Sequence, residues 1–461
     1  MFSGNLQKAS KYLYTRAQNI RKLALPFYIN QPGGTMAHRE VLLSGMISKL
    51  WRFGFAAGVV AVLAIATAVA QEIPKTTPDK AGFSSERLAR LNAKFHAHVD
   101  EGRAAGIITL IARHGKIVHL DVYGKADIEE NKPMQANSLF RMYSMTKPVT
   151  STALLMLYEE GKFQLDDPLD QYFPEFKDLQ VYVSGSGTDM KLEPPKRKPT
   201  VRDIFRHTGG FSYGFGPTPI DKAYQEAKVT ADLAGLVPKL AKIPLAYQPG
   251  TQWQYSVSHD LQAALVEKLS GMKFENFVST RILKPLDMKD SSLGIPALDI
   301  SRLTTSYGTK DGKLVPSDKP ATSSYKGVGG GSSLTSSARD YLRFAQMLAN
   351  GGQLNGVRLL APGTVRLMSS NHLPDGVWMG MGQPGVNTGT GYGLGVSVLV
   401  DPVRRGNLGS KGEWGWSGAA TTHLIIDPEK DIIGIFLTQK MMDDRIFYNE
   451  FITMLYQAFM E

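Results

Sequence analysis

The hydrophobic pattern of this 461-residue chain changes period twice between its ends. Near the start, residues 107–112 and 117–123 are two β-type runs separated by a His-Gly pair, which predicts a hairpin. In the middle, apolar residues recur at the spacing of amphipathic helices. The helical runs of this block are residues 149–158, 201–205, 261–269 and 274–283. The last third returns to β-type runs, which are residues 392–400, 419–426 and 432–438.

Further helices are predicted near both ends of this pattern. Ser84 precedes an amphipathic stretch at residues 87–99 and is expected to cap it. Residues 338–349 are predicted as a helix that ends at a Gly-Gly pair. A final amphipathic helix is predicted at residues 445–459.

Two early strands and three late strands around a helical block predict one sheet that both ends of the chain build. The expected fold is therefore α/β (α+β): a mainly antiparallel five-stranded sheet flanked by helices, with an inserted, mostly helical domain. The predicted boundaries are residues 75–165 and 325–461 for the sheet domain and 166–324 for the helical domain. Residues 1–70 are predicted to be a leader.

The leader has the layout of a signal peptide. Lys49 and Arg52 precede an uncharged apolar run, residues 53–70, which ends in Ala-Val-Ala. Signal peptidase requires a charged segment, an apolar segment and small residues at the cleavage site. We expect cleavage between Ala70 and Gln71, and export to the periplasm or the medium. The alternative is an uncleaved membrane anchor, because the run is close to the ~18 residues that begin to span a bilayer.

The positive charge of the chain is concentrated in the leader. The formal net charge is +10, but residues 1–70 contain eight Lys or Arg and a single acidic residue. From residue 71 onward the excess is three positive charges, so no nucleic acid partner is expected. The chain has no cysteine, which excludes disulfides, thiol catalysis and Cys-ligated zinc.

Three Ser-x-x-Lys motifs compete for the role of a serine nucleophile, and they begin at Ser144, Ser270 and Ser323. A chain of this composition contains the motif by chance about twice, so the surroundings must decide. Ser270 is predicted at the end of a helix and Ser323 in a loop beside glycines, whereas Ser144 opens a helix. There Ser144 and Lys147 share one face, and the N–H groups of the helix start favour an oxyanion.

Two other motifs suggest different chemistry. A Gly-x-Ser-x-Gly around Ser212 matches the nucleophile elbow of α/β-hydrolases, which needs a strand before the serine and a helix after it. The preceding residues are helix-like and Pro217 follows, so we do not expect an elbow. His96 and His98 form an isolated His-x-His, which we expect on a solvated helix face and not in a zinc site.

Three segments together resemble the motifs of serine beta-lactamases and penicillin-binding proteins. Residues 140–148, Phe-Arg-Met-Tyr-Ser-Met-Thr-Lys-Pro, resemble the active-site segment of class C enzymes and of the related family VIII carboxylesterases. Tyr255 and Ser256 match the tyrosine motif of that family. Residues 416–419, Trp-Ser-Gly-Ala, stand where the family has Lys-Thr-Gly or a substitute containing Trp or His. The resemblance covers residues 78–455, and the motifs follow the family's order.

The resemblance implies a serine hydrolase that forms an acyl-enzyme on Ser144. Lys147 and Tyr255 are implied as proton acceptors, because a serine hydroxyl needs a neighbouring base. The sequence leaves open which of the two acts first. Backbone N–H groups of Ser144 and Ala419 are implied as the oxyanion hole. No metal and no organic cofactor is implied.

Two departures from the beta-lactamase pattern concern the substrate. Val257 replaces the usual Asn, and Trp416 replaces the Lys that suits a substrate carboxylate. With Ser417 and Gly418 they form the predicted substrate-binding set. They favour a carboxylesterase for short-chain or aryl esters, with a small-molecule ester or amide as the partner. The alternatives are a class C-like beta-lactamase, a D-amino-acid peptidase or amidase, an acyltransferase, and a non-catalytic binder or sensor of the penicillin-binding type.

Overall fold

The computed structural model describes residues 72–229, 233–295, 300–323, 328–380, 386–442 and 446–461. By its internal contacts the chain divides after Ala70, and the following description concerns the second unit alone. The predicted leader, its cleavage site and Lys326 lie outside the described residues.

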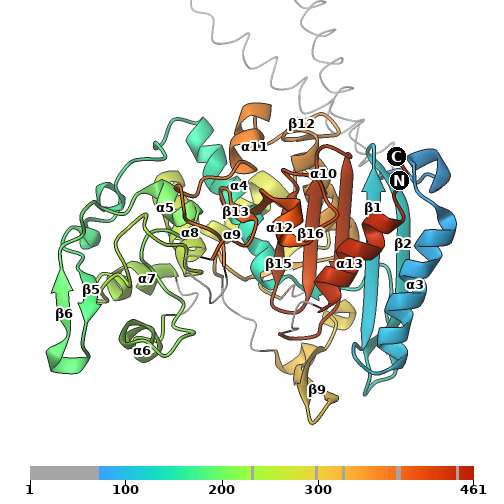
Figure 1. The fold of residues 1–461 in the computed structure, drawn as a ribbon, viewed down its shortest axis with the longest axis horizontal. Coiled ribbons are helices and arrows are strands. Elements are labelled where there is room, and N and C mark those ends of the chain that lie inside the picture. The colour runs from blue at the N-terminus through green and yellow to red at the C-terminus, as the bar shows by residue number, and fades with distance from the viewer. Residues whose placement is uncertain (1–71, 230–232, 296–299, 324–327, 381–385, 443–445) are drawn as a thin grey trace, which may run out of the picture. The chain divides into compact units, whose positions relative to one another are not determined.

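Within the described residues, an antiparallel eight-stranded sheet forms the centre of the structure (Figure 1). Its strands, in spatial order, are β13 (Thr390–Tyr392), β14 (Ser397–Leu399), β15 (Trp414–Gly418), β16 (Thr422–Asp427), β17 (Ile432–Leu437), β1 (Gly106–Arg113), β2 (Lys116–Asp127) and β3 (Lys132–Pro133). β1 pairs with both β2 and β17, with Ile108 opposite Leu437. Both ends of the chain therefore build one sheet, which confirms the predicted fold class.

The sheet has more strands than the predicted five. The run at 392–400 is divided into β13 and β14 by a turn in which the Gly393 N–H donates to the Val396 carbonyl at 2.8 Å. The sequence does not predict β15, because Trp-Gly-Trp-Ser-Gly has two glycines and no β-branched residue. Pairing with β14 and β16 makes it a strand. β3 adds a two-residue edge beyond β2.

Helices cover the sheet and fill the long segment between its strands. They are α3 (Ser85–Asp100), α4 (Thr146–Glu159), α5 (Val201–Phe205), α6 (Pro219–Glu226), α7 (Leu233–Leu240), α8 (Ser258–Ser270), α9 (Phe274–Val278), α10 (Ala338–Ala349), α11 (Pro362–Met368), α12 (Pro402–Arg405) and α13 (Ile446–Gln457). The predicted helical runs correspond to α3, α4, α5, α8, α9, α10 and α13. The run at 274–283 differs, because α9 continues as a π-helical turn, Ser279–Leu283.

Short strands and one 3-10 turn complete the parts that matter for the site. A small antiparallel sheet joins β4 (Phe140–Arg141), β10 (Leu334–Ser336) and β7 (Ser292–Leu293). Three separate pairs are β5 (Val181–Ser184) with β6 (Lys191–Glu193), β8 (Ser306–Lys310) with β9 (Lys313–Asp318), and β11 (Gln353–Leu354) with β12 (Val357–Arg358). The 3-10 turn η2 (Tyr143–Met145) leads from β4 towards α4.

Alternate residues of the central strands face two separate apolar cores. On β17, Ile433 belongs to the larger core with α4, α8 and α10, whereas Ile432 belongs to a second core with α3 and α13. This alternation explains why the strands are apolar along their whole length. Figure 1 shows α13 lying across the strands. Gly434 allows that approach, since a Cβ there would lie 2.7 Å from Leu455.

Local capping explains several helix starts. The Ser84 hydroxyl accepts the Arg87 N–H at the start of α3, as predicted. Thr200 and Thr218 form capping boxes at α5 and α6, in which an aspartate three residues later bonds back to the cap. These caps anchor helices in the part of the chain that the sequence analysis assigns to the helical domain.

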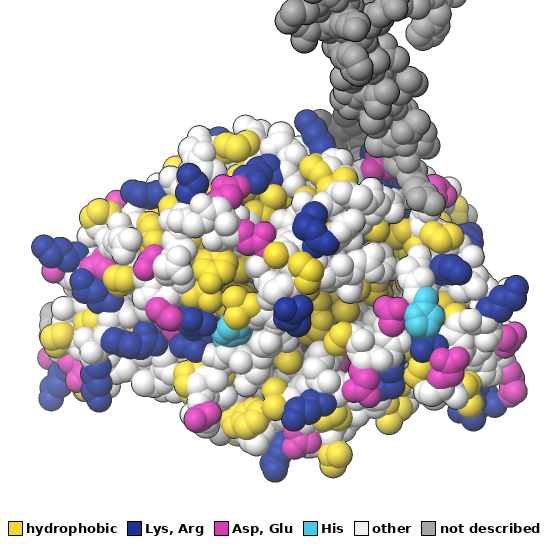
Figure 2. All heavy atoms as spheres, turned by 90° about the horizontal axis from the view of Figure 1, so that it is seen from above, with side chains coloured by type: hydrophobic (Ala, Val, Ile, Leu, Met, Phe, Trp, Pro, Cys, Tyr) yellow, Lys and Arg dark blue, Asp and Glu magenta, His cyan; other side chains and the backbone are white. Residues whose placement is uncertain are grey.

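The surface carries charges of both signs. Figure 2 shows Lys and Arg side chains interspersed with Asp and Glu on the face that it presents. Several of the basic groups are paired, for example Arg202 with Asp166 at 2.7 Å. Over the described residues, no helix combines the length and the apolar character needed to cross a membrane.

Candidate active site

Ser144 lies in η2, a 3-10 turn that runs directly into α4. The residue before it, Tyr143, has a positive φ of 44°, a conformation that is rare for a bulky residue. The Met142 N–H donates to the Leu334 carbonyl of β10 at 2.8 Å. The Thr146 hydroxyl donates to the Tyr143 carbonyl at 2.6 Å. Contacts on both sides therefore hold Ser144 at the start of the helix, in a tighter turn than the sequence predicts.

Both predicted proton acceptors meet the Ser144 hydroxyl. Lys147 Nζ lies 3.2 Å from Ser144 Oγ, and Tyr255 OH lies 2.6 Å from the same atom. Lys147 belongs to the first turn of α4, whereas Tyr255 lies in the loop before α8, 111 residues after the serine. Both distances allow hydrogen bonds. The fold thus brings the three side chains together on one oxygen.

The Lys147 side chain is buried, with 1% of its surface exposed. Its Nζ also donates to the Gly331 carbonyl at 2.9 Å. The same nitrogen lies 4.6 Å from the ring centroid of Tyr255 and 5.3 Å from that of Tyr213. Acceptor oxygens and aromatic faces both stabilise a cation. These surroundings suit an ammonium group.

A glycine segment connects Lys147 to a buried carboxyl group. Asp260 of α8 accepts the Gly331 N–H at 3.1 Å, so Gly331 links Asp260 to Lys147. Burial raises the pKa of Asp260, and the charge of Lys147 opposes that rise. Gly330 makes the close approach possible, because a Cβ there would lie 2.0 Å from the His259 carbonyl oxygen. The glycines at 329–331 therefore let the backbone reach the lysine.

β15 carries the third predicted motif and packs against the backbone that precedes Ser144. A Cβ on Gly418 would lie 2.3 Å from the Met142 carbonyl oxygen, so glycine is required here. Ser417 Oγ shares a hydrogen bond of 2.8 Å with His423 Nδ1 of β16. The motif ends a strand, although the predicted β-type run, residues 419–426, begins only at its last residue. Ala419 follows in the turn to β16.

Trp416 and Tyr255 belong to an apolar cluster, which we call the aromatic wall. Its members are Trp253, Tyr255, Leu373, Val377, Met379, Tyr392 and Trp416. The Trp416 ring lies 5.7 Å from the Tyr255 ring and stands edge-on to the Tyr392 ring at 5.1 Å. Tyr255, Val377, Met379 and Trp416 are only partly buried. The wall therefore presents apolar surface next to the hydroxyl group of Tyr255.

Val257 lies apart from this surface. It occupies the N-cap position of α8, is buried and packs in the larger apolar core. Its replacement of the usual Asn therefore removes a polar side chain without adding exposed apolar surface.

Two buried histidines lie behind Tyr255. The His207 ring centroid is 5.0 Å from that of Tyr255 and 4.9 Å from that of His259. Burial is the main cause that lowers the pKa of both imidazoles, and the charge of Lys147 lowers it further. Both rings are therefore neutral at neutral pH.

The competing serines take part in other contacts. Ser212 is buried, and its hydroxyl donates to Asp221 of α6 at 2.6 Å. No strand–serine–helix elbow surrounds it among the described residues. The Ser270 hydroxyl donates to the Val266 carbonyl at 2.6 Å inside α8. Ser323 donates to an aspartate of β9 at 2.6 Å.

The histidines of α3 have separate partners. His96 Nε2 bonds to Asp121 at 2.8 Å, and His98 bonds to Glu450 of α13. His98 is 2% exposed, so the expectation that both histidines lie on a solvated face is wrong for this residue. α13 covers α3 at that point. Over the described residues, no group of three or more His, Asp or Glu side chains is placed to hold a metal ion.

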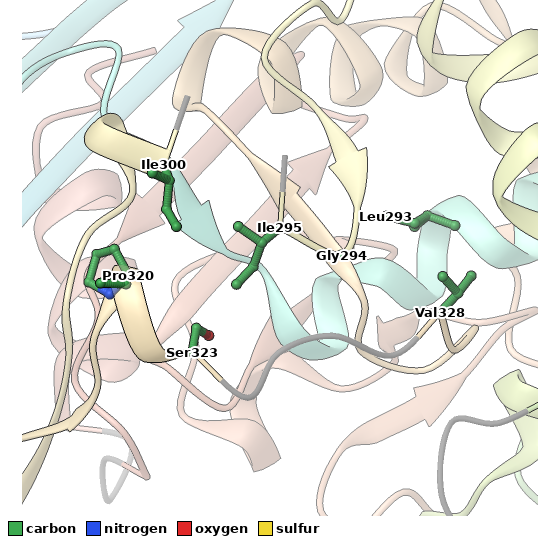
Figure 3. Close-up of a pocket in the computed structure, with 8 residues that line it drawn as sticks. Leu293, Gly294, Ile295, Ile300, Pro320, Ser323 and Val328 are labelled. Carbon is green, nitrogen blue, oxygen red and sulfur yellow. The ribbon is translucent and has the colours of Figure 1, made fainter. Parts of the chain in front are cut away.

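A separate cavity of about 350 Å³ lies beside β7 (Figure 3). It is lined by Leu293, Gly294, Ile295, Ile300, Pro320, Ala321, Ser323 and Val328. Ser144, Lys147 and Tyr255 are not among these residues, so the cavity is distinct from the candidate active site.

Four neighbours of the central trio lie outside the three motifs: His207, Tyr213, Asp260 and Gly331. They lie 63 to 187 positions beyond Ser144 in the chain, and only the fold brings them near it. Gly331 belongs to a run rich in glycine, residues 327–331, and this run is a signal in the sequence for this region.

Comparisons with known proteins agree with this geometry. The family model described as Beta-lactamase matches residues 91–453. Protein Rv1367c of Mycobacterium tuberculosis is 33% identical over 355 residues, which cover 75% of this chain and 88% of that protein. Esterase EstB of Burkholderia gladioli is 29% identical over 381 residues, which cover 76% and 90%. Unliganded simvastatin synthase (LovD) of Aspergillus terreus has the same fold, with a TM-score of 0.70, 21% identity and coverage of 82% and 100%. The chain belongs to the beta-lactamase family of serine hydrolases.

Proposed function

We propose that this serine hydrolase is a carboxylesterase that acts on neutral short-chain or aryl esters through an acyl-enzyme on Ser144. The observation that carries the proposal is the convergence of Lys147 Nζ and Tyr255 OH on Ser144 Oγ, at 3.2 and 2.6 Å. A serine hydroxyl becomes an effective nucleophile when such a neighbour removes its proton.

In this proposal Tyr255 takes the proton first, as a phenolate. Its oxygen is the closer of the two, and the contacts of Lys147 suit an ammonium whose charge stabilises a phenolate. Ser144 Oγ attacks the ester carbonyl carbon, its proton passes to Tyr255, and the carbonyl oxygen becomes an oxyanion. When the bond to the leaving group breaks, Tyr255 returns the proton to the departing alkoxide, and the alcohol leaves.

The oxyanion is assigned to the backbone N–H groups of Ser144 and Ala419. The close contact between Gly418 and Met142 supports this assignment, because it packs the end of β15 against the nucleophile turn. One donor of this kind is typically worth about 3 kcal/mol in the transition state.

In deacylation, water takes the place of Ser144 as the nucleophile, and Ser144 becomes the leaving group. A water molecule attacks the acyl carbon, its proton passes to Tyr255, and the Ser144–acyl bond breaks with return of that proton to Ser144. The acid leaves and the enzyme is restored. An alcohol in place of water yields a new ester, which is the acyltransferase alternative.

The preference for neutral acyl groups is supported by the aromatic wall. Trp416, at the position of the family's Lys, is part of it. Two arginines that could replace this Lys have other contacts: Arg404 Nε lies 3.8 Å from Asp401, and Arg405 lies 5.9 Å from the Tyr448 ring centroid. An apolar acyl or aryl group therefore fits this surface better than a carboxylate does.

The test compares p-nitrophenyl butyrate with nitrocefin as substrates of the purified protein. We expect ester turnover to dominate. Ser144→Ala is expected to lose this activity, and Ser270→Ala is expected to retain it. Dominant nitrocefin turnover would overturn the esterase assignment. An active Ser144→Ala variant would overturn the nucleophile.

We also propose export of the chain by its leader. N-terminal sequencing of the protein from expressing bacteria is expected to begin at Gln71. A mature protein that retains residues 53–70 would contradict cleavage and support an anchor.

A further inference from the structure

We propose that His207 is a positioning residue that holds Tyr255 against Ser144, and this inference rests on the proposed role of Tyr255 in proton transfer. His207 follows α5 and lies 48 residues before Tyr255 in the chain. Within the described residues, His207 does not contact Ser144 itself.

His207 contacts the Tyr255 segment at three successive points. Its carbonyl accepts the N–H of Gln254, the residue before the tyrosine, at 3.0 Å. Its Nδ1 shares a hydrogen bond of 3.0 Å with the hydroxyl of Ser256, the residue after the tyrosine. Its ring packs against the Tyr255 ring itself, with centroids 5.0 Å apart and planes inclined at 55°. Backbone, side chain and ring of one residue thus enclose the tyrosine.

His207 is itself held rigidly. It has a positive φ of 58°, which for a histidine persists only where the surroundings determine it. Its side chain is fully buried, and its carbonyl accepts a second hydrogen bond from Tyr247 OH at 3.1 Å. Its ring also packs edge-on against Trp253 at 5.8 Å and Tyr392 at 5.3 Å. A group fixed in this way transmits a defined position to Tyr255.

The geometry assigns His207 to positioning and not to proton transfer. Its Nδ1 is engaged by Ser256, and its ring lies against the ring of Tyr255, whose hydroxyl group bonds to Ser144. The charged or titratable groups around it are Lys147, Tyr255, His259 and Tyr392. A neutral imidazole there leaves the charge balance between Lys147 and Tyr255 unchanged.

A positioning role predicts a specific kinetic change. Displacing a reacting group by about 1 Å costs up to a hundredfold in rate. Trp416, the partly exposed ring that the proposed function assigns to the substrate, is not among the rings that His207 contacts, so substrate binding is expected to change little. The loss therefore appears in kcat and not in KM.

The experiment measures p-nitrophenyl butyrate hydrolysis by His207→Phe, His207→Asn, Tyr255→Phe and the double variant. Phe keeps a ring but cannot bond to Ser256, whereas Asn tolerates the positive φ and offers a polar atom to Ser256. We expect His207→Phe to lower kcat roughly 10- to 100-fold with KM within about twofold, and Asn, which restores the bond to Ser256 but not the ring contact, to recover part of it. In the Tyr255→Phe background, His207→Phe is expected to add less than about twofold, because both act through one group.

His98→Asn is the matched control, since His98 is also a buried histidine but lies on α3 and packs against α13. It is expected to lower the melting temperature and leave kcat unchanged. Circular dichroism identifies any variant that fails to fold. If His207→Phe does not fold, Ser256→Ala removes the same hydrogen bond from the other side and is expected to lower kcat several-fold.

Two results would overturn the role of His207. The first is a wild-type kcat in folded His207→Phe or, if that variant does not fold, in Ser256→Ala. The second is an equal loss of kcat from His207→Phe in the wild-type and the Tyr255→Phe backgrounds. Full activity of Tyr255→Phe would instead overturn the proposed function of Tyr255. The two failures are therefore distinguishable.

Discussion

The same motif, Ser-x-x-Lys, occurs at Ser144 and at Ser270, and the two sites have opposite surroundings. At the first, Lys147 is 1% exposed and bonds to both Ser144 and Gly331. At the second, the Lys273 side chain is 66% exposed and pairs with Glu267 at 3.8 Å. Ser270 bonds back into its own helix, and Gly271 ends that helix in the left-handed conformation.

The Ser-x-x-Lys motif therefore supplies only two of the groups that the chemistry needs. At Ser144 the rest comes from distant segments: a phenol from the loop before α8, a carbonyl from the glycine segment and a strand end from β15. At Ser270 the described contacts come from neighbours within a few residues. Nucleophilic chemistry is therefore expected only where the fold brings these remote segments together.

The largest expected effect separates the two lysines. Lys147→Met removes the cation beside Ser144 and Tyr255, and is expected to lower kcat/KM for p-nitrophenyl butyrate about 10³- to 10⁴-fold. Lys273→Met removes only an exposed ion pair, worth at most about 1 kcal/mol of stability. It should retain wild-type kcat/KM. An equal loss of kcat/KM in the two variants would contradict the assignment of catalysis to Ser144 and Lys147.

The next largest effect tests the group that only the first site has. Tyr255→Phe keeps the ring in the aromatic wall but removes the oxygen 2.6 Å from Ser144 Oγ. We expect kcat to fall about 10²- to 10³-fold, as for loss of a general base, while KM changes little. Steady-state kinetics over a range of ester concentrations measure both values. An unchanged kcat would show that Tyr255 is not the proton acceptor and would assign that role to Lys147.

A smaller effect concerns substrate choice beside Ser144. Trp416→Ala removes the part of the aromatic wall that stands edge-on to Tyr392. We expect kcat/KM for p-nitrophenyl butyrate to fall about tenfold relative to p-nitrophenyl acetate, as for loss of one large apolar contact. The ratio between the two substrates is an internal control for folding. A parallel loss for both esters would show that Trp416 supports the site without selecting the acyl group.

The smallest expected effect concerns the pH dependence of stability. Burial raises the pKa of Asp260 above its value in the unfolded chain, so the folded state binds more protons between the two pKa values. The free energy of unfolding therefore falls as pH rises through that interval. Asp260→Asn should flatten this dependence, whereas Glu267→Gln beside Ser270 should keep it. Urea unfolding between pH 4 and pH 8 measures both variants, and identical pH profiles would contradict the assignment.

Periodicity and turn residues predict most of the frame of this molecule. The β1–β2 hairpin, α10 and α13 follow from local patterns, and the order of strands at both ends predicts the shared sheet. β15 could not be predicted, because its strand conformation depends on pairing with β14 and β16 and not on its own residues. In the same way, Tyr255 could be proposed from a family motif, but His207 and Asp260 could not. Their relation to Ser144 exists only through tertiary contacts.

The central claim is that Ser144, and not Ser270 or Ser212, carries the acyl group. Mass spectrometry of peptides from protein labelled with a fluorophosphonate probe tests it directly. We expect one modified serine, in the peptide that contains residues 140–148, and no labelling of Ser144→Ala. Modification of Ser270 or Ser212, or undiminished labelling of Ser144→Ala, would contradict it.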